Sequence, residues 1–328
     1  MNVLIIGGAG MVGQKLAERL VKDGGLGGCP VSQLTLFDVV DAQKPPAAAV
    51  DVVVQTGDLS DPAQAAALVQ QRPDVIFHLA AVVSGEAEAD FDKGYRINLD
   101  GTRYLLEAIC RTEDYCPRVV FTSSIAVFGA PFPEAIGDDF HTTPLTSYGT
   151  QKAIGELLLS DFSRRGLLDG IGIRLPTICV RPGKPNKAAS GFFSNIIREP
   201  LAGHEAILPV SEDVRHWHAS PRAAVGFLLH AATIDSKTVG PRRNLTMPGI
   251  SVTVGEQIAA LRAIAGDEVV NRIRREPDAR IINMVDGWPR RFDARRATQL
   301  GFQAESSFED IIRVHIEDEL GGKISAAR

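Results

Sequence analysis

The stretch VLIIGGAGMVG, residues 3–13, decides the fold of this chain. Its first four residues form a continuous apolar run, which is typical of a strand buried on both faces. Glycines follow directly, and Leu16, Leu20 and Val21 then recur at the spacing of a helix. A strand, a glycine turn and a helix in this order predict a turn where backbone N–H groups can approach a pyrophosphate.

The glycines of this stretch fit two spacings at once. Gly8, Gly10 and Gly13 follow G-x-G-x-x-G, and Gly7, Gly10 and Gly13 follow G-x-x-G-x-x-G. Such a motif also fits an ordinary strand-to-helix turn, but its place after a buried strand favours a dinucleotide site. The cofactor-binding residues predicted in this stretch are Gly7, Gly10, Met11, Val12 and Gly13.

Composition and charge narrow the class of protein. The 328 residues favour one large domain with a smaller lobe, and 45% hydrophobic with 23% charged residues is typical of a globular chain. A net charge of −5 gives no basis for binding nucleic acid or an anionic membrane. We expect no signal peptide, because Met1 leads directly into a strand, and no apolar run is long enough to cross a bilayer.

The thiols and imidazoles do not predict a metal site. The cysteines have no CxxC spacing, so we expect reduced thiols in a cytoplasmic protein. His216 and His218 share a strand face but supply too few ligands for a metal. The four cysteines are Cys29, Cys110, Cys116 and Cys179.

The first half of the chain alternates strands with helices. Beyond the first strand, the pattern predicts strands at 34–37, 50–55, 75–81, 119–124 and 171–175, and helices at 62–71, 95–110 and 147–165. Segments 24–28, 84–92 and 129–144 are expected to be loops. This alternation is typical of the α/β class, with a doubly wound parallel Rossmann sheet.

An acidic residue ends the second of these strands. A carboxylate at this position can accept hydrogen bonds from both ribose hydroxyls of NAD and would repel the 2′-phosphate of NADP. Asp38 has this position, whereas Asp41 is better explained as a solvated loop residue. The sequence therefore predicts NAD as the cofactor.

The alternation ends after residue 176. Helices are expected at 191–201, 221–232, 254–265 and 308–319, with an extended segment at 213–218. We predict an NAD-binding domain at residues 1–175, rejoined by about 213–235. A smaller, mixed α/β substrate-binding lobe is expected from 176–212 and 236–328.

Tyr148 and Lys152 are four residues apart on a predicted helix, so they share one face. A lysine ammonium nearby stabilises a phenolate and lowers the tyrosine pKa from its reference value of about 10. Tyr148 could then take an alcohol proton while a hydride leaves the same carbon for NAD. Alone, this spacing is also common in surface pairs.

Polar residues on neighbouring elements complete this group. The fifth strand ends in Ser123 and Ser124, and a serine at this place can hold a substrate oxygen. Adjacent side chains point to opposite faces of a strand, so the two serines are alternatives for this role. Asn98, on the preceding helix, can anchor a water or a backbone group behind the lysine.

These motifs, in this order, resemble the extended branch of the short-chain dehydrogenases, the NAD-dependent epimerase/dehydratase family. The resemblance implies that Ser124 is the catalytic serine, with Ser123 as the alternative, and that Asn98, Tyr148 and Lys152 complete the catalytic set. Phe128 replaces the usual tyrosine of the strand-five motif. Further cofactor contacts implied by the resemblance are Asp58, Leu59, Leu79, Ala80, Ala81, Asn98, Tyr148, Lys152, Pro176 and Thr177.

Later segments are similar to those of the D-erythronate dehydrogenase group of this family: RPGKPN (181–186), AASGF (188–192), REPL (198–201), DVRHW (213–217) and SPR (220–222). This resemblance implies oxidation at C2 of a four-carbon sugar acid to the 2-oxo acid. Such a substrate needs a cation for its carboxylate and polar partners for its hydroxyls. Arg181, Lys184, Arg215 and Arg222 are candidate cations; the other candidate substrate contacts are Ser84, Ser123, Ser124, Tyr148, Asn186 and Ser190.

Two other functions stay open at this point. A nucleoside-diphosphate-sugar 4-epimerase would keep NAD bound, with Arg215 on a phosphate. A non-catalytic dinucleotide sensor would have no need for Tyr148 and Lys152. The resemblance to the family also implies a homodimer, paired through the helix that carries Tyr148 and the long helix before the fifth strand.

Overall fold

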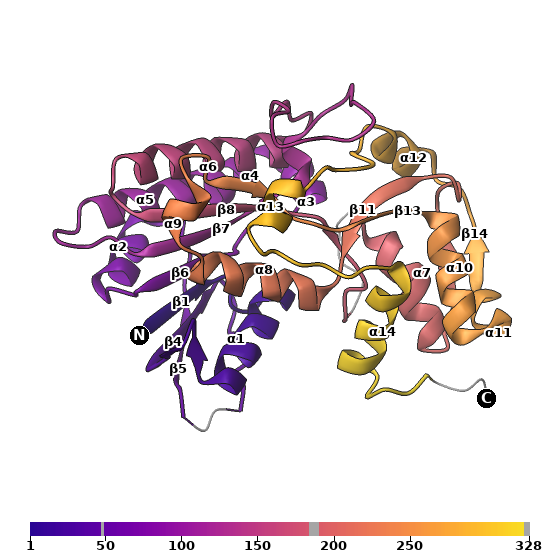
Figure 1. Cartoon of the computed structure of the whole chain (residues 1–328), viewed down its shortest axis with the longest axis horizontal. Helices are drawn as coiled ribbons and strands as arrows, with labels where there is room; N and C mark the ends of the chain where they lie inside the picture. Colours follow the sequence, from indigo (N-terminus) through magenta and orange to yellow (C-terminus); the bar gives the residue numbers. More distant parts are fainter. Residues whose placement is uncertain (47–48, 184–189, 325–328) are drawn as a thin grey trace.

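A seven-stranded parallel sheet forms the centre of the computed structural model, which describes residues 1–46, 49–183 and 190–324 (Figure 1). The strand order is β12-β8-β7-β6-β1-β4-β5, so the chain reverses direction across the sheet between β4 and β6, on either side of β1. The strands are β1 (Asn2–Ile6), β4 (Gln33–Asp38), β5 (Asp51–Thr56), β6 (Val75–His78), β7 (Arg118–Ser124), β8 (Asp169–Leu175) and β12 (Asn244–Thr246).

The register brings the carboxyl ends of the central strands together. Ile6, at the end of β1, pairs with Phe37 of β4 on one side and with His78 of β6 on the other. In open α/β sheets the ligand crevice lies outside the carboxyl ends of the strands, at the point where the strand order reverses. The predicted cofactor site therefore falls beside β1, as the glycine motif requires.

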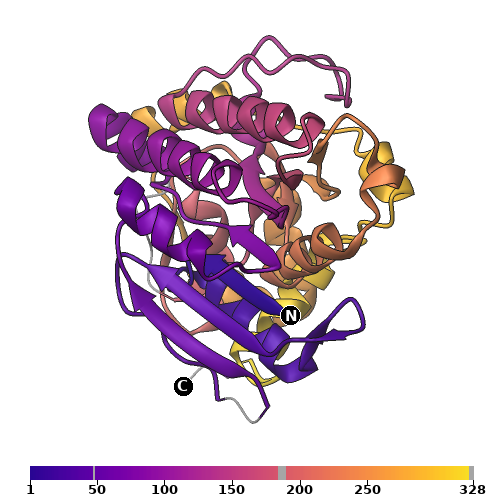
Figure 2. The ribbon, with the colours of Figure 1, turned by 90° about the vertical axis from the view of Figure 1, so that its left-hand side faces the viewer.

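Helices cover both faces of the sheet and bury its apolar residues. Figure 2 shows the strands as one layer, with helices on either side. One face packs against α2 (Pro62–Gln70), α5 (Gly101–Cys110) and α6 (Ser147–Arg164), and the other against α1 (Met11–Asp23) and α8 (Pro221–Thr233). Leu4 and Ile6 face the first core, while Val3 and Ile5 face the second, which confirms a strand buried on both sides.

A second apolar core lies at the other end of the molecule, beyond the carboxyl ends of the strands (Figure 1). Its helices are α7 (Gly191–Leu201), α10 (Val254–Ala265), α11 (Asp267–Val270), α12 (Ala279–Asp286) and α14 (Phe308–Glu319). They pack beside two small sheets: β10 (Ala206–Leu208) with β14 (Ile273–Arg275), and β13 (Ile250–Thr253) with β11 (Arg215–Ala219) and β9 (Thr177–Ile178).

Some segments differ from the prediction. Residues 84–92, expected as a loop, form α3 (Ser84–Ala89) and begin α4 (Phe91–Gly94), and Asp90 caps α4 by accepting from the Lys93 N–H at 3.0 Å. Segment 24–28, also expected as a loop, is part of a short hairpin of β2 (Gly25–Leu26) and β3 (Cys29–Pro30). The helix expected at 95–110 begins with a π-helical turn, Tyr95–Asp100.

The division of the chain into two units by residue number stays a prediction. β12 joins the main sheet beside β8, although it follows residue 236. The short helices α9 (Ser236–Val239) and α13 (Arg295–Gln299) also lie near this part of the molecule (Figure 1). In the described part of the chain, none of the helices is both long and apolar enough to cross a membrane.

Candidate active site

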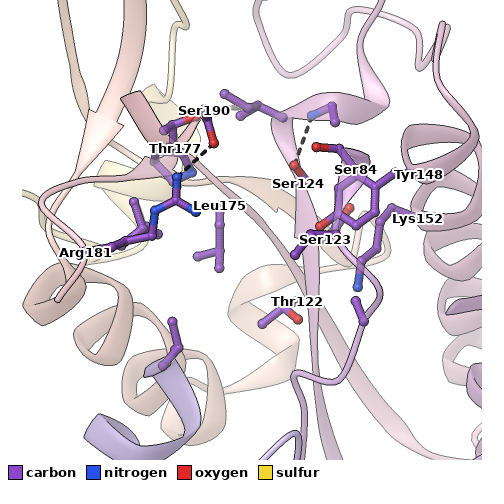
Figure 3. Close-up of a pocket in the computed structure, with 18 of the residues that line it drawn as sticks. Ser84, Thr122, Ser123, Ser124, Tyr148, Lys152, Leu175, Thr177, Arg181 and Ser190 are labelled. Atoms are coloured by element: carbon purple, nitrogen blue, oxygen red, sulfur yellow. Dashed lines mark hydrogen bonds between the residues drawn. The ribbon is translucent and has the colours of Figure 1, made fainter. Parts of the chain in front are cut away.

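A cavity of about 480 Å³ lies at the carboxyl ends of β1, β6, β7 and β8, between the main sheet and the second core. Predicted site residues line it together: Gly7, Gly10, Met11, Val12, Gly13, Leu79, Ala81, Ser84, Ser123, Ser124, Tyr148, Lys152, Pro176, Thr177 and Ser190. Figure 3 shows the catalytic candidates on one side of this cavity and Arg181 with Ser190 on the other.

The glycine loop is shaped for a closely approaching ligand. Gly7 has φ +94°, and a Cβ there would lie 2.6 Å from the backbone nitrogen of Ala80. A Cβ at Gly13 would collide with the carbonyl oxygen of Gly7. α1 begins after Gly10 with no side-chain cap, so its first N–H groups are available to an anion. This loop fits the pyrophosphate of a dinucleotide.

Asp38 lies beside this loop at the end of β4. One carboxylate oxygen accepts from the Ala9 N–H at 2.9 Å, and the other accepts from the Val39 N–H at 2.7 Å. Asp41 instead accepts a hydrogen bond from Thr56. The structure thus ties Asp38, rather than Asp41, to the glycine turn.

Other predicted cofactor residues are not among those that line the cavity. Ala80 packs against Gly7, Leu59 is buried next to Gly101, and Asp58 pairs with Arg96 at 2.8 Å. Asn98 is buried in the π-helical turn, accepts from the Val82 N–H at 2.7 Å and donates to the Val82 carbonyl at 3.0 Å. Its side chain therefore holds the segment after β6, which lines the cavity.

Tyr148 and Lys152 lie on the first two turns of α6, whose N-cap Thr146 accepts from the Gly149 N–H at 3.1 Å. Lys152 Nζ lies 4.8 Å from the centre of the Phe121 ring and 5.8 Å from that of Tyr148. Ser124 faces the same space, and its Oγ accepts from the Ala126 N–H at 3.1 Å (Figure 3). Ser123 donates its hydroxyl to buried Glu156, which leaves Ser124 as the better placed of the two serines.

Burial has the largest effect on the pKa values of Tyr148 and Lys152. It raises the pKa of Tyr148 to about 12, against a smaller opposing effect of the Ser124 hydroxyl. It lowers the pKa of Lys152 to about 7, although nearby Glu156 acts in the other direction. In the protein alone, removal of the phenol from water is therefore the main influence on the pKa of Tyr148, and it raises that pKa.

Buried histidines should make the fold sensitive to acid. Burial lowers the pKa of His78 to about 3 and that of His216 to about 4. Below pH 6.5 the unfolded chain binds protons that the folded chain does not, so stability should fall as the pH drops toward 4. The lowered pKa of His216 alone should reduce the free energy of unfolding by about 3 kcal/mol between neutral pH and pH 4. Urea unfolding between pH 7.5 and 4.5 measures the slope of the free energy of unfolding against pH.

A matched pair of variants tests the cause. His78→Asn should make the free energy of unfolding depend less steeply on pH. His204→Asn, at an exposed position, should leave that dependence unchanged. A free energy of unfolding that stays constant from pH 6.5 to 4.5 in the native protein would contradict this explanation.

Arg181 supplies a cation at the far end of the cavity. Its guanidinium donates to Ser190 Oγ at 3.0 Å, and its backbone carbonyl accepts from Arg198 at 2.8 Å. Arg198 also lines the cavity, but it is paired with Glu199. Among the described residues, no carboxylate forms an ion pair with Arg181, so its charge is available to a ligand.

Other cations expected near the substrate lie elsewhere. Arg215 is outside the cavity lining, donates to the Ser251 carbonyl at 2.8 Å and pairs with Glu256 at 3.1 Å. Arg222 pairs with Glu317 and Asp318 of α14. Lys184 and Asn186 fall outside the described residues.

Sequence reasoning missed one wall of the cavity. Gly287, Trp288 and Pro289, which follow α12, line it together with His216 of β11. The sequence pattern indicates for His216 only a metal-ligand role, for which the ligands are too few. Within the described residues, no group of three or more potential ligands is placed to hold a metal ion.

A parallel sheet with a glycine loop at its reversal point, and a Tyr–Lys pair facing the same cavity, define a dinucleotide-dependent enzyme of the Rossmann class. Residues 3–241 match the model of the NAD dependent epimerase/dehydratase family. The chain belongs to this family, and its cofactor is NAD.

The chain is similar over nearly its whole length to three described proteins. It is 52% identical to D-erythronate dehydrogenase of Cupriavidus necator over 322 residues, 97% of this chain and 98% of that one. It is 43% identical to D-erythronate dehydrogenase of Haemophilus influenzae, over 98% of this chain and all of the other. A crystal structure described as the nucleoside-diphosphate-sugar epimerase from Agrobacterium tumefaciens has 68% identity and a TM-score of 0.96, with 98% and 95% of the chains covered.

The position of Asp38 predicts a preference for NAD over NADP. Replacing Asp38 by Ala should weaken that preference, because a carboxylate at this position can accept from the ribose hydroxyls and would repel a 2′-phosphate. The ratio of kcat/KM for the two cofactors measures the effect. Asp41→Ala serves as the control and should leave the ratio unchanged. Equal use of both cofactors by the native protein would contradict this role of Asp38.

Proposed function

We propose that this protein is an NAD-dependent dehydrogenase that oxidises the C2 hydroxyl of D-erythronate to 2-oxo-D-erythronate. The full-length similarity to two D-erythronate dehydrogenases is the observation that carries this proposal. The cavity supports it, because Tyr148, Lys152 and Ser124 lie together on one side and the cation Arg181 lies on the other.

The positions of the side chains support the following catalytic roles. Ser124 holds the C2 oxygen by a hydrogen bond, and the Tyr148 oxygen accepts the proton of the C2 hydroxyl. NAD, when bound, supplies the hydride acceptor and a positively charged ring. A positive charge beside Tyr148 lowers its pKa, which opposes the effect of burial. Lys152 stabilises the phenolate from the next turn of α6.

The far end of the cavity suits the carboxylate of the substrate. We propose that the carboxylate binds Arg181, whose side chain is largely removed from water and donates a hydrogen bond to Ser190. A hydrogen bond between a guanidinium and a carboxylate is stronger than one between neutral groups. Ser84 and Ser190 line the cavity, and we propose that their hydroxyl groups bind hydroxyls of the substrate. Met11, Val12 and the glycines of the loop are assigned to the pyrophosphate, and Leu79, Ala81, Pro176 and Thr177 to the remainder of NAD.

A 4-epimerase remains the second candidate, because the A. tumefaciens protein is described as a nucleoside-diphosphate-sugar epimerase. Such a substrate carries a diphosphate and requires cations for it. Arg215, the arginine expected to bind phosphate in that case, lies outside the cavity lining. A dinucleotide sensor is disfavoured, because Tyr148 and Lys152 are both present and face the cavity.

Net consumption of NAD separates the first two functions. Purified protein should form NADH with D-erythronate, followed at the absorbance of reduced nicotinamide, and should not interconvert UDP-glucose and UDP-galactose. An absence of NADH with D-erythronate, together with interconversion of the UDP-sugars, would establish the epimerase instead.

Location and assembly are also proposals. We place the protein in the cytoplasm, since Cys29, Cys110 and Cys116 are free and exposed, as expected for reduced thiols. We propose a homodimer paired through α5 and α6. Leu157, with 69% of its surface exposed on α6, supports an apolar contact at this face.

A further inference from the structure

His216 bridges two walls of the cavity, and the mechanism above makes no use of it. One ring nitrogen, Nδ1, lies 2.8 Å from the carbonyl oxygen of Pro289. The other, Nε2, lies 2.7 Å from the hydroxyl of Thr177. His216, Thr177 and Pro289 all line the cavity. The imidazole therefore links Thr177, which lies beside Ser190 on the side of the cavity away from Tyr148 (Figure 3), to the segment after α12.

These two contacts fix the tautomer of the imidazole. A carbonyl oxygen can only accept, so Nδ1 carries the hydrogen and donates to Pro289. Burial lowers the pKa of His216 to about 4, which leaves Nε2 without a proton at neutral pH. Nε2 then accepts from the Thr177 hydroxyl, and the lone pairs of the Thr177 oxygen remain available to a donor in the cavity.

Aromatic packing holds the ring in this orientation. Its plane is within 5° of that of Phe193, with the ring centres 5.2 Å apart. The Trp288 ring lies 5.3 Å from it on the wall segment. His218, two residues along β11, contacts Gln257 instead and does not line the cavity. Of the two histidines on β11, His216 is therefore the one that connects Thr177 with Pro289.

We propose that His216 is a positioning residue that holds residues 287–289 against the substrate end of the cavity and so limits the length of the acid that fits. The donor bond to Pro289 fixes this wall, while the bond that Nε2 accepts orients the hydroxyl of Thr177, a residue assigned to NAD. The proposal rests on the proposed function, because it concerns which acids reach Tyr148.

Two isosteric substitutions separate the two bonds. The amide nitrogen of an asparagine side chain occupies about the place of Nδ1, and the terminal amide of a glutamine about the place of Nε2. His216→Asn can therefore keep the donor to Pro289 but loses the Thr177 contact. His216→Gln can keep the Thr177 contact but releases Pro289.

The readout is selectivity for chain length. D-Ribonate has the C2 and C3 configuration of D-erythronate and one more carbon. His216→Gln should raise the ratio of kcat/KM for D-ribonate over D-erythronate about fivefold, as expected from the loss of one hydrogen bond. His216→Asn should leave that ratio within twofold and raise the KM for NAD. His218→Gln, the matched control, should change neither quantity.

A second variant tests the wall directly and covers a failure of the His216 variants to fold. Trp288→Ala removes the largest side chain of the segment and should raise the same ratio. An unchanged ratio in Trp288→Ala would overturn the proposal, as would an unchanged ratio in folded His216→Gln.

Acrylamide quenching of Trp288 fluorescence tests the position of the wall without any activity. In a Trp217→Phe background, Trp288 is the remaining tryptophan of the chain. His216→Gln should increase quenching, and His216→Asn should not. If the native protein fails to oxidise D-erythronate, the proposed function falls, and this measurement still decides whether His216 holds the wall. Equal quenching in all three proteins would overturn that role.

Discussion

Replacement of Tyr148 by Phe is expected to lower kcat for D-erythronate oxidation by about 10²- to 10⁴-fold, the usual range for loss of a general base. Phenylalanine keeps the ring beside Lys152 and Phe121 but removes the oxygen that accepts the proton. NAD affinity, measured by calorimetry, should stay within about threefold, because the glycine loop and Asp38 are unchanged.

A second variant distinguishes loss of the base from general damage to the site. Tyr104→Phe, on α5 away from the cavity lining, should keep full activity. Retained oxidation in Tyr148→Phe would remove Tyr148 from the mechanism. Loss of both oxidation and NAD binding would mean that the ring positions the cofactor.

Arg181→Gln is expected to lower kcat/KM for D-erythronate by about 10- to 100-fold, chiefly through KM. A hydrogen bond to a charged group contributes about 1.5–3 kcal/mol, and glutamine retains a donor without the charge. Steady-state kinetics with D-erythronate measure the effect. Arg181→Lys should recover part of the loss, since it restores the charge without the two-pronged geometry.

Arg215→Gln is the matched control for this charge. Arg215 lies outside the cavity lining and is paired with Glu256, so its loss should change kcat/KM for the acid less than twofold. A large effect at Arg215 with none at Arg181 would contradict the assignment of the carboxylate and favour a phosphorylated substrate.

Local patterns predicted much of the fold and the catalytic group. The bounds of α7, α10 and α14 match the expected segments, since each carries apolar residues at helical spacing between clear end signals. Tyr148 and Lys152 share a face because four residues make about one helical turn. The glycine loop lies where its motif places it, beside β1.

Tertiary contacts decided what the patterns missed. α3 has no apolar periodicity, and its place depends on contacts such as the one from the Ser147 N–H to Glu88 at 3.0 Å. The Gly287–Pro289 wall is more than 100 residues from Thr177 in sequence, so no local motif joins them. The pKa of Tyr148 depends on how completely the fold removes it from water, which spacing to a lysine does not reveal.

The central claim is that a hydride leaves C2 of D-erythronate for NAD. D-Erythronate deuterated at C2 tests it directly, with the reduced cofactor and the acid product examined by NMR. We expect deuterium on the nicotinamide of the reduced cofactor and a 2-oxo acid free of deuterium, while substrate deuterated at C3 should transfer none. Transfer from C3, or recovery of the C2 deuterium in an acid product without reduced cofactor, would contradict it.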